Sequence, residues 1–477
     1  MRGTAAEKFR IFFDPSRFDR PVSSKTSSTF FHYQTMIATE NETYQEQHAA
    51  FQRQPSPPWL VELRQRGFDA FNRLGIPNKR LEDWRFTNVA PLAERPYVLA
   101  SLAPSEVETS TDQIKALVEQ ATLDEDFHRL VFINGRYSDE WSRLQDLSDG
   151  VVIENLASVI ADRPDDLRQT LESELGFDNA AFAALNTAFV EDGAFVEIPD
   201  GVTLDRPLHC VFLSIGNQQT VSHTRNVVRV GKHGKAHVIE SYLGHGEAYF
   251  TNAITQVSLD ENAELDHHKL QHEQLGALHI ALTGVDQQTS SRFRSHYFSF
   301  GATLARNELD CLLDGEQIET TLNGLYMPTG EQLMDCRTRI DHAKPHCNSY
   351  ELYKGILNDR AKGVFNGKIF VRQDAQKTDA KQSNQALLLS DDAVVNTKPQ
   401  LEIYADDVRC THGATIGELD DAAMYYLRSR GIPDDLARKI LIFAFANDVV
   451  QGVELPAVRR HLESVLLSGH ELSEDIL

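Results

Sequence analysis

The spacing of apolar residues changes twice along the chain and divides it into three parts. After Pro58, apolar residues fall three to five positions apart until Gly75, which predicts a helix with one buried stripe. From Gly193, and for about 220 residues, apolar and polar residues alternate in short runs separated by Gly, Asp and Asn. This alternation is typical of β-strands. After Gly417 the helical spacing returns.

Two shorter segments of the first part also have a recognisable pattern. Residues 128–139 read as a strand followed by a tight turn at Asn134 and Gly135. Residues 164–189 place leucines one helical turn apart, with an interruption at Gly176, which predicts a second helical tract. We therefore expect the first part to be mixed and mostly helical.

A loose unit recurs within the alternating region: a few alternating apolar residues, a small polar turn, then more apolar residues. It occurs at residues 228–238, 257–267, 355–365 and 401–411. The uneven starts exclude a strict hexapeptide or nonapeptide repeat, whereas a parallel β-solenoid with variable turns fits them as well as a sandwich does. The length of the region favours the solenoid, so the expected fold class is mostly β, with a solenoid core between helical ends.

Two helices are predicted near the C-terminus. Pro433 stands near a first turn beside Asp434 and Asp435, whose charges favour a helix N-terminus by about 0.3 to 1 kcal/mol each. The stretch that follows is apolar almost all round, which predicts burial, and a last helix begins near Pro456. Such helices can cap the open end of a solenoid or dock a partner.

Composition and charge narrow the classes of partner. The chain has 477 residues, too many for one ordinary core, and 41% of them are apolar. Apolar runs fall short of the roughly 18 to 20 residues of a membrane span. The net charge of −23 repels phosphate backbones and anionic lipids. We expect protein partners, and neither nucleic-acid nor membrane binding.

Cysteine usage and the N-terminus favour a cytoplasmic protein. Five cysteines without a CxxC pair argue for a reducing compartment. Residues 1–35 lack the apolar core of a secretory signal, and their acidic residues make a plastid transit peptide the less favoured interpretation. We expect four regions: a disordered extension (1–42), a mainly helical domain (43–192), a β-helix core (193–416) and a C-terminal helical domain (417–477).

Most cysteines and histidines have a structural interpretation. Cys210, Cys311 and Cys336 lie on apolar strand faces and are interpreted as core thiols. The three histidines within residues 267–272 would divide between two strand faces, and we interpret them as solvated.

A turn at Pro345 gathers a possible metal-ligand set. It contains His342, His346 and Cys347, which are ligand types that zinc and iron accept. Three such residues near one turn also occur by chance in a histidine-rich chain, and this is the favoured interpretation.

The segment VRCTHG (408–413) presents a different pair. On a strand, Val408, Cys410 and His412 point to one face. Thiolate and imidazole both bind iron or zinc, and a protonated imidazole beside a thiol favours the thiolate. A tetrahedral centre needs about four ligands, so this strand would supply half a site. The alternative is a buried cysteine and a hydrogen-bonded histidine at the end of a solenoid.

Residues 362–432 resemble the signature region of SufD proteins, within the SufB/SufD family of the SUF iron–sulfur cluster assembly system. The similarity runs from about Trp59 to Leu466 and includes FAALNTAFVEDGAFVEIPDG (182–201), whereas signatures of nucleotide-binding loops, hydrolases and metalloproteases are absent. The resemblance implies a right-handed parallel β-helix between helical domains. It also implies a non-catalytic scaffold that pairs with SufB and binds the SufC ATPase.

The same resemblance implies roles for particular residues. Cys410 and His412 would lie at the SufB interface and help to hold a nascent cluster or iron, while SufB supplies the cysteine that receives sulfur. No cofactor would bind the chain stably alone, and a transient cluster would form in the complex. Closure of SufC on ATP would move the C-terminal helices and open the interface. The SufC contact is expected at Tyr425, Tyr426, Leu427, Arg428, Arg430 and Gly431.

Several alternatives stay open. Tyr425 and Leu427 could merely pack a cap. A SufB-like paralogue would have another segment in place of Cys-Thr-His-Gly-Ala-Thr. The chain alone could be a homodimer, because solenoid edges tend to pair. A β-solenoid carbohydrate-active enzyme could use acidic residues near the candidate strand, although a solvated turn and a helix start explain them better: Asp406, Asp407, Asp420 and Asp421.

Overall fold

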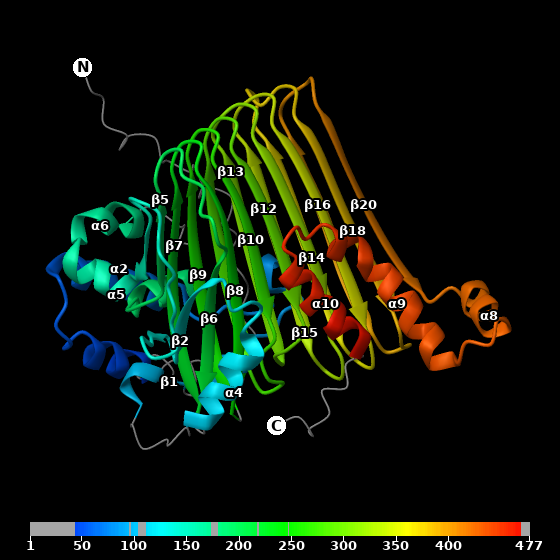
Figure 1. Cartoon of the computed structure of the whole chain (residues 1–477), viewed down its shortest axis with the longest axis horizontal. Helices are drawn as coiled ribbons and strands as arrows, with labels where there is room; N and C mark the ends of the chain where they lie inside the picture. The colour runs from blue at the N-terminus through cyan, green and yellow to red at the C-terminus, as the bar shows by residue number, and fades with distance from the viewer. Residues whose placement is uncertain are drawn as a thin grey trace, which may run out of the picture.

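The computed structural model describes residues 43–94, 97–103, 111–172, 180–216, 219–246 and 248–468. The extension expected over residues 1–42 and the break expected at Gly176 lie outside these ranges. The described chain is mostly strand, with helices towards both ends (Figure 1). The predicted mostly-β class is confirmed.

Two long sheets form the body of the molecule, and from residue 194 onward successive strands alternate between them (Figure 1). The first sheet contains β4 (Val152–Asn155), β5 (Ala194–Ile198), β7 (Thr220–Val230), β9 (Tyr249–Leu259), β11 (Leu278–Gln287), β13 (Leu304–Leu313), β15 (Leu333–His342), β17 (Lys362–Val371) and β19 (Val394–Ile403), with β1 (Val98–Leu99) beside β7. The second contains β3 (Arg136–Tyr137), β2 (His128–Ile133), β6 (Leu208–Ile215), β8 (Lys235–His245), β10 (Glu264–Gln271), β12 (Arg292–Ser299), β14 (Glu319–Tyr326), β16 (Asn348–Leu357), β18 (Asp379–Leu388) and β20 (Arg409–Glu418).

The strands from β5 to β20 form a parallel β-solenoid. Each strand pairs with the strand two elements later, so one turn of the coil adds one strand to each sheet. The length of a turn varies: Leu278 pairs with Leu304, 26 residues on, whereas Lys362 pairs with Val394, 32 residues on. The predicted solenoid with irregular turns is confirmed.

One corner of the solenoid repeats the same backbone conformation from turn to turn. Between a strand of the first sheet and the next strand of the second, one non-glycine residue takes a left-handed φ of 59° to 64°. These residues are His233, Asn262, Ser290, Gln317, His346 and Lys377. The sequence units at 228–238, 257–267 and 401–411 span this corner, whereas the unit at 355–365 spans the opposite one. The units are therefore corners of two kinds, which explains their uneven spacing.

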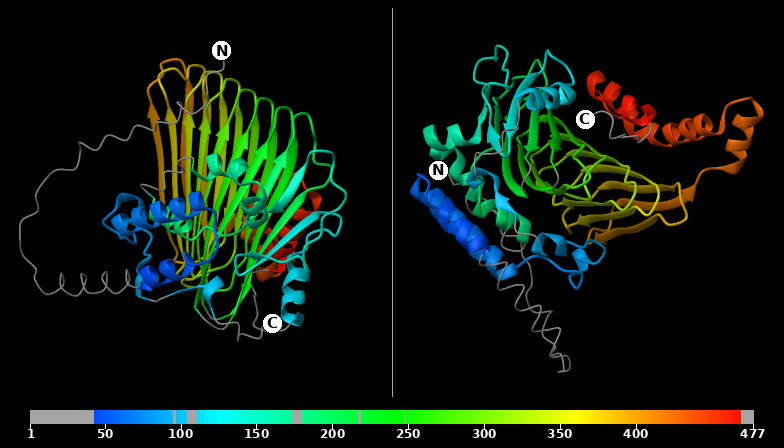
Figure 2. Two further views of the ribbon diagram at one scale, coloured as in Figure 1. Left: turned by 90° about the vertical axis from the view of Figure 1, so that its left-hand side faces the viewer. Right: turned by 90° about the horizontal axis from the view of Figure 1, so that it is seen from below.

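Most helices of the N-terminal part pack along the first sheet (Figure 2). They are α2 (Pro58–Leu74), η3 (Glu82–Trp84), α3 (Ala90–Glu94), η4 (Ala100–Leu102), α5 (Leu156–Asp162), α6 (Pro164–Glu172) and α7 (Ala181–Ala188). Helix α4 (Thr111–Ala121) packs on the second sheet instead, with Leu117 and Val118 in one cluster with Val211 of β6. The predicted helix after Pro58 and the turn at Asn134 and Gly135 are confirmed. The N-terminal part also contributes β1 and β4 to the first sheet and β2 and β3 to the second.

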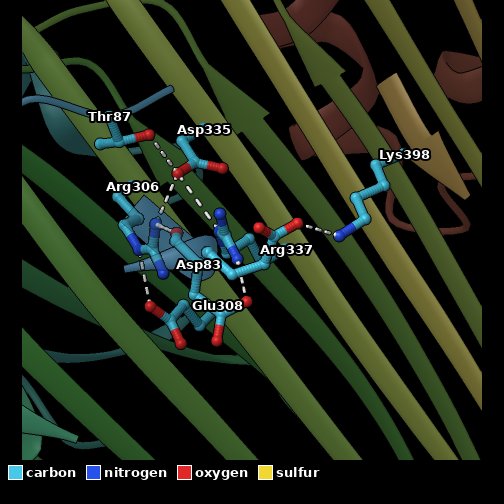
Figure 3. Close-up of polar contacts among 8 residues, drawn as sticks. Asp83, Thr87, Arg306, Glu308, Asp335, Arg337 and Lys398 are labelled. Carbon is cyan, nitrogen blue, oxygen red and sulfur yellow. Dashed lines mark hydrogen bonds and ion pairs between the residues drawn. The ribbon is translucent and has the colours of Figure 1, made fainter. Parts of the chain in front are cut away.

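The N-terminal part is fixed to the first sheet by a buried arginine (Figure 3). The Arg306 guanidinium donates to Asp335 Oδ2 at 2.6 Å and to the Asp83 carbonyl at 2.9 Å, and it stacks 3.6 Å above the Trp84 ring. Thr87 Oγ1 donates to the same Asp335 oxygen at 2.5 Å. Both Arg306 and Asp335 are buried. The segment around η3 is therefore held in one place on strands β13 and β15.

The described C-terminal helices leave the end of the solenoid open (Figures 1 and 2). Helices α9 (Asp434–Gln451) and α10 (Pro456–Ser468) lie along its side, whereas α8 (Asp421–Ser429) projects beyond the sheets. Apolar residues of α10 and the second half of α9 pack on the outer face of the second sheet, against residues such as Leu270 and Phe298. The idea that these helices cap the open end is wrong, because their apolar stripe fits the sheet face.

Along the described part of the chain, no helix combines the length and the apolar character that crossing a bilayer requires.

Candidate functional site

The last turn of the solenoid leaves an edge open on both sheets. β19 pairs with β17 and β20 pairs with β18, and within the described ranges no strand follows on the far side of either (Figure 1). Unpaired N–H and C=O groups along such an edge can accept another strand. Cys410 and His412 both lie on β20.

The register of β20 fixes the direction of these two side chains. Cys410 pairs with Ala380, and His412 pairs with Gln382, in parallel. Ala380 and Gln382 lie in the solenoid interior, with 0% and 3% of their surface exposed. Because paired residues of neighbouring strands share a face, Cys410 and His412 occupy the interior row of an uncovered turn. Cys410 is accordingly half-buried and His412 is exposed.

The environment of Cys410 favours the protonated form of its thiol. Its side chain packs against the small apolar cluster that closes the last turns, which includes Ile369 and Ala380. Burial raises the pKa of the Cys410 thiol above its usual value of 9, and the nearby Asp379 carboxylate adds to the increase. In the free chain Cys410 is therefore a thiol at neutral pH. Metal binding would have to displace its proton.

Cys410 and His412 offer one sulfur and one nitrogen ligand. Across the described residues, no group of three or more His, Cys, Asp or Glu side chains is arranged to hold a metal ion. Two ligands are half of what a tetrahedral iron or zinc centre uses.

The structure separates the possible metal ligands around Pro345. His342 is buried, with Nε2 3.0 Å from Ser349 Oγ. His346 occupies the left-handed corner position, and the buried Cys347 thiol donates to the Gly315 carbonyl at 3.1 Å. His342 thus ends β15, His346 lies in the corner and Cys347 directly precedes β16, and among the described residues they form no ligand group for a metal. They are explained as corner and core residues.

The other three cysteines lie in the solenoid core. Cys210, Cys311 and Cys336 are buried, and burial raises the pKa of each thiol. The prediction of core thiols is confirmed.

The interpretation of the histidines within residues 267–272 as solvated is wrong for two of them. His267 faces the interior, with Nε2 3.0 Å from Glu240 Oε1, and only 1% of it is exposed. His268 is fully buried on the outer face and stacks on His296. Strand β10 is central and covered on both sides, because the C-terminal helices lie over its outer face. Alternation by itself does not show that the second face is covered.

Sequence reasoning also missed polar residues inside the solenoid. Glu240 accepts hydrogen bonds from Tyr242 at 2.7 Å and Thr255 at 2.6 Å. Glu351 accepts from Gln382 at 2.7 Å, and burial raises the pKa of Glu351 to about 7. The usable signal was the strand alternation, which places Glu240 and Glu351 at interior positions between apolar residues.

The C-terminal helices expose an apolar surface. Helix α8 projects beyond the sheets (Figure 1), and its described side chains are all exposed or half-buried. Tyr425 is 76% exposed and Tyr426 57%, while Leu436 and Ile440 leave the first half of α9 exposed. Tyr425 therefore does not pack a cap. The expected burial of α9 holds for Ala446, Val449 and Val450 in its second half and for Ala437, whereas the rest of its first half is exposed or half-buried. We call this surface the α8–α9 patch, defined by Tyr425, Tyr426, Leu436 and Ile440.

Two family profiles match nearly the whole described chain. Residues 37–210 match the SufBD protein N-terminal region, and residues 212–445 match the SufBD core domain of SUF system FeS cluster assembly. The chain belongs to the SufBD family of iron–sulfur cluster assembly proteins. The recognition made from residues 362–432 is thus confirmed at the level of the family.

The alignments with individual SufBD relatives cover most of this chain and most of each relative. The chain is 34% identical over 385 residues to the iron–sulfur cluster assembly protein SufD of Escherichia coli, spanning 80% of this chain and 86% of the relative. It is 33% identical over 413 residues to a SufBD family protein of Synechocystis, spanning 84% and 89%. It is 30% identical over 387 residues to the Arabidopsis thaliana protein named ABCI7, chloroplastic, spanning 79% and 78%. Within the SufBD family, the chain is thus SufD-like.

The acidic residues near β20 have structural partners. Asp407 pairs with Lys377, and Asp406 lies in the same exposed turn. The Asp420 side chain accepts a hydrogen bond from the Ala422 N–H and so caps α8, with Asp421 in the first turn. The structure therefore supports a solvated turn and a helix start.

Proposed function

We propose that this chain is a non-catalytic scaffold subunit that pairs with SufB through the open end of its solenoid. In this proposal, Cys410 and His412 contribute ligands to a nascent iron–sulfur cluster or to iron, which are the cargo of assembly. SufBD family membership supports the reaction context. The observation behind the site is the half-buried thiol and exposed imidazole on the interior row of an uncovered turn.

The geometry suits a site that is completed by a second chain. A partner that covers the open end would exclude water from Cys410 and His412 and could add the missing ligands. Before that, the thiol stays protonated because burial raises its pKa. The raised pKa protects the cysteine from oxidation in the free chain, since the thiolate is the reactive form.

The test is cluster formation by a complex reconstituted anaerobically with SufB and SufC. We expect Cys410→Ala and His412→Ala each to lower cluster yield by at least tenfold, measured by absorption and Mössbauer spectra. Thr411→Val is the matched control, because Thr411 is exposed on the same strand and faces the other way. Unchanged yield in both Ala variants would show that the site assignment is wrong.

We further propose that the SufC ATPase docks on the α8–α9 patch. Exposed tyrosines on a projecting helix are the kind of side chain that protein interfaces use. We expect Tyr425→Ser with Tyr426→Ser to weaken SufC binding at least tenfold in a pulldown or by calorimetry. Tyr350→Ser is the control, because Tyr350 is 45% exposed on β16, away from the patch. Equal weakening of SufC binding by the control variant would show that the α8–α9 patch is not the specific SufC docking site.

A homodimer of the free chain is a second candidate state, because the open edges of β19 and β20 can pair with a second copy. Size-exclusion with light scattering, with and without SufB, distinguishes the two assemblies. A SufB-like role is less well supported, because relatives across most of the chain are named SufD. The carbohydrate-active alternative loses support from the structural partners of the acidic residues.

We propose a cytoplasmic location and no stably bound cofactor in the free chain. Placement in a plastid stroma is the alternative, since one relative is named chloroplastic. Mass spectrometry of the natural N-terminus would test this, because removal of residues 1–35 would indicate a transit peptide.

A further inference from the structure

A buried polar column lies behind His412. Glu351 on β16 pairs in register with Gln382 on β18, and Gln382 pairs with His412 on β20. All three residues thus occupy one interior row in three successive turns. The first two are buried, with 1% and 3% exposed, and the third is exposed at the open end.

The orientation of the Gln382 amide is fixed by its neighbours. Its Nε2 donates to Glu351 Oε2 at 2.7 Å, while Glu351 Oε1 accepts from Thr338 Oγ1. On the opposite sheet, Gly367 leaves room for the amide, because a Cβ there would lie 2.1 Å from Gln382 Nε2. The Nε2 group of the Gln382 amide is therefore used in the hydrogen bond to the Glu351 carboxyl group.

The oxygen end of the same amide is buried and available. Gln382 Oε1 has no hydrogen-bond partner among the residues that the structure describes. A buried acceptor without a donor is unfavourable, so a donor within reach would be used. The next side chain in the row is the His412 imidazole, on a strand about 4.8 Å away.

The other interior positions of β18 next to β20 offer no such pairing. Ala380 stands opposite Cys410 and has no polar side chain, and Asn384 stands opposite Ala414, which has no donor. Among Ala380, Gln382 and Asn384, Gln382 is the residue whose unpartnered amide oxygen stands opposite a side chain that can donate a hydrogen bond, the His412 imidazole.

We infer that Gln382 is a positioning residue for His412, with its Oε1 accepting a ring N–H of the neutral imidazole. This bond would select one tautomer and leave the other ring nitrogen with its lone pair directed to a metal. Histidine ligands in metal sites commonly donate their second ring N–H in this way. The metal role rests on the proposed function, whereas the hydrogen bond is inferred for the free chain as well.

The test is the tautomer ratio of His412 in the full-length free chain. With ¹⁵N-labelled histidine, long-range proton–nitrogen spectra above pH 8 report the two tautomers, and His412→Gln assigns the signal. We express the ratio relative to that of histidine in an unstructured peptide, where the Nε2–H tautomer is already the commoner one. On this scale we expect one tautomer to be enriched about fivefold and the ratio to fall towards one in Gln382→Met. Glu351→Gln keeps an acceptor for the Gln382 amide and should preserve the ratio.

Two further variants keep the test decisive. Asn384→Leu removes another buried amide from the same strand, and we expect it to leave the His412 ratio unchanged. Glu351→Leu frees the Gln382 amide to rotate and should also lower the ratio, which provides a second measurement should Gln382→Met fold poorly. A ratio that is unaltered in the folded Gln382 or Glu351→Leu variant overturns the inference.

Failure of the inference and failure of the proposed function give different results. If the ratio responds to Gln382 but His412→Ala leaves cluster yield unchanged, the hydrogen bond exists and the ligand role is wrong. If His412→Ala abolishes cluster yield but Gln382→Met leaves the His412 tautomer ratio unchanged, His412 is a ligand and the positioning role of Gln382 is wrong.

Discussion

At the scale of single residues, exposure separates Cys410 from the other cysteines. Cys210, Cys311, Cys336 and Cys347 are buried between the two sheets, whereas Cys410 is half-buried because no further turn covers it. The same uncovered turn exposes His412. The chemistry available at this end therefore depends on position in the solenoid more than on local sequence.

Thiol labelling should single out Cys410. Under native conditions we expect iodoacetamide to modify one cysteine, at a rate that rises with pH up to and beyond 9, because burial raises the pKa of this thiol. After denaturation all five should react. Peptide mass spectrometry identifies the site, and Cys410→Ala is the control. Rapid native labelling of a second cysteine would contradict the burial pattern.

The stability of the fold should depend on Glu351. Its pKa is raised to about 7 by burial, against 4.5 in the unfolded chain. Between these values the folded state holds the proton and the unfolded state does not, so stability falls as pH rises. The loss is on the order of 3 kcal/mol once pH exceeds 7. Glu351→Gln should remove it.

Urea denaturation at pH 5 and pH 8 measures this effect. We expect the difference in unfolding free energy between the two pH values to be smaller in Glu351→Gln than in the wild type. Other acids, such as the half-buried Asp286 with a pKa raised to about 6, contribute in both proteins and cancel in the comparison. Parallel pH profiles would show that Glu351 is ionised in the folded chain.

At the scale of elements, the edge strand β19 has one side without a neighbouring strand in the described structure, and the C-terminal helices differ in how much of their surface is buried. β19 contains Pro399, which lacks an N–H, and prolines within sheets are found mainly on edge strands. Helix α10 and the second half of α9 are anchored by apolar contacts, with Val450 and Leu462 fully buried. Helix α8 has nine residues and no such anchor in the described structure. An isolated helix of that length is marginal in water.

Hydrogen exchange should reflect this contrast. In the free chain we expect amides of α8 to exchange at least a hundredfold faster than those of α10, measured by mass spectrometry on peptides that cover each helix. Adding SufC should slow exchange in α8 if the α8–α9 patch is its docking site. Equal protection of the two helices in the free chain would show that α8 is anchored.

At the scale of the whole molecule, helices cover the sides of the solenoid and leave its end free. Most N-terminal helices pack on the first sheet, α4, α9 and α10 pack on the second, and α8 projects beyond the last turn (Figure 2). A partner at the open end and a partner on α8 would thus meet different surfaces, one on the solenoid body and one on a projecting helix. The Arg306 network holds the N-terminal part to that body.

Breaking this network should be costly. Arg306→Met leaves Asp335 buried without its main partner, and we expect it to lower the free energy of unfolding by about 3 to 5 kcal/mol. Lys398→Met is the control, because its ion pair with Glu82 is exposed and should change stability by less than about 1 kcal/mol. Chemical denaturation measures both, and a small effect of Arg306→Met would mean that Asp335 finds another partner or a proton.

The spacing of the apolar residues determined the order of the regions along the chain: helices, then short strands, then helices. It also determined that Val408 and Cys410 share a face, because alternation along a strand is a local property. The resemblance of residues 362–432 supplied the family. Only the tertiary structure decided which faces are covered, because coverage depends on distant segments, as the burial of His268 beneath the C-terminal helices and the projection of α8 show. It likewise brought together Glu351, Gln382 and His412, about 30 residues apart in sequence, since the solenoid stacks one turn on the next.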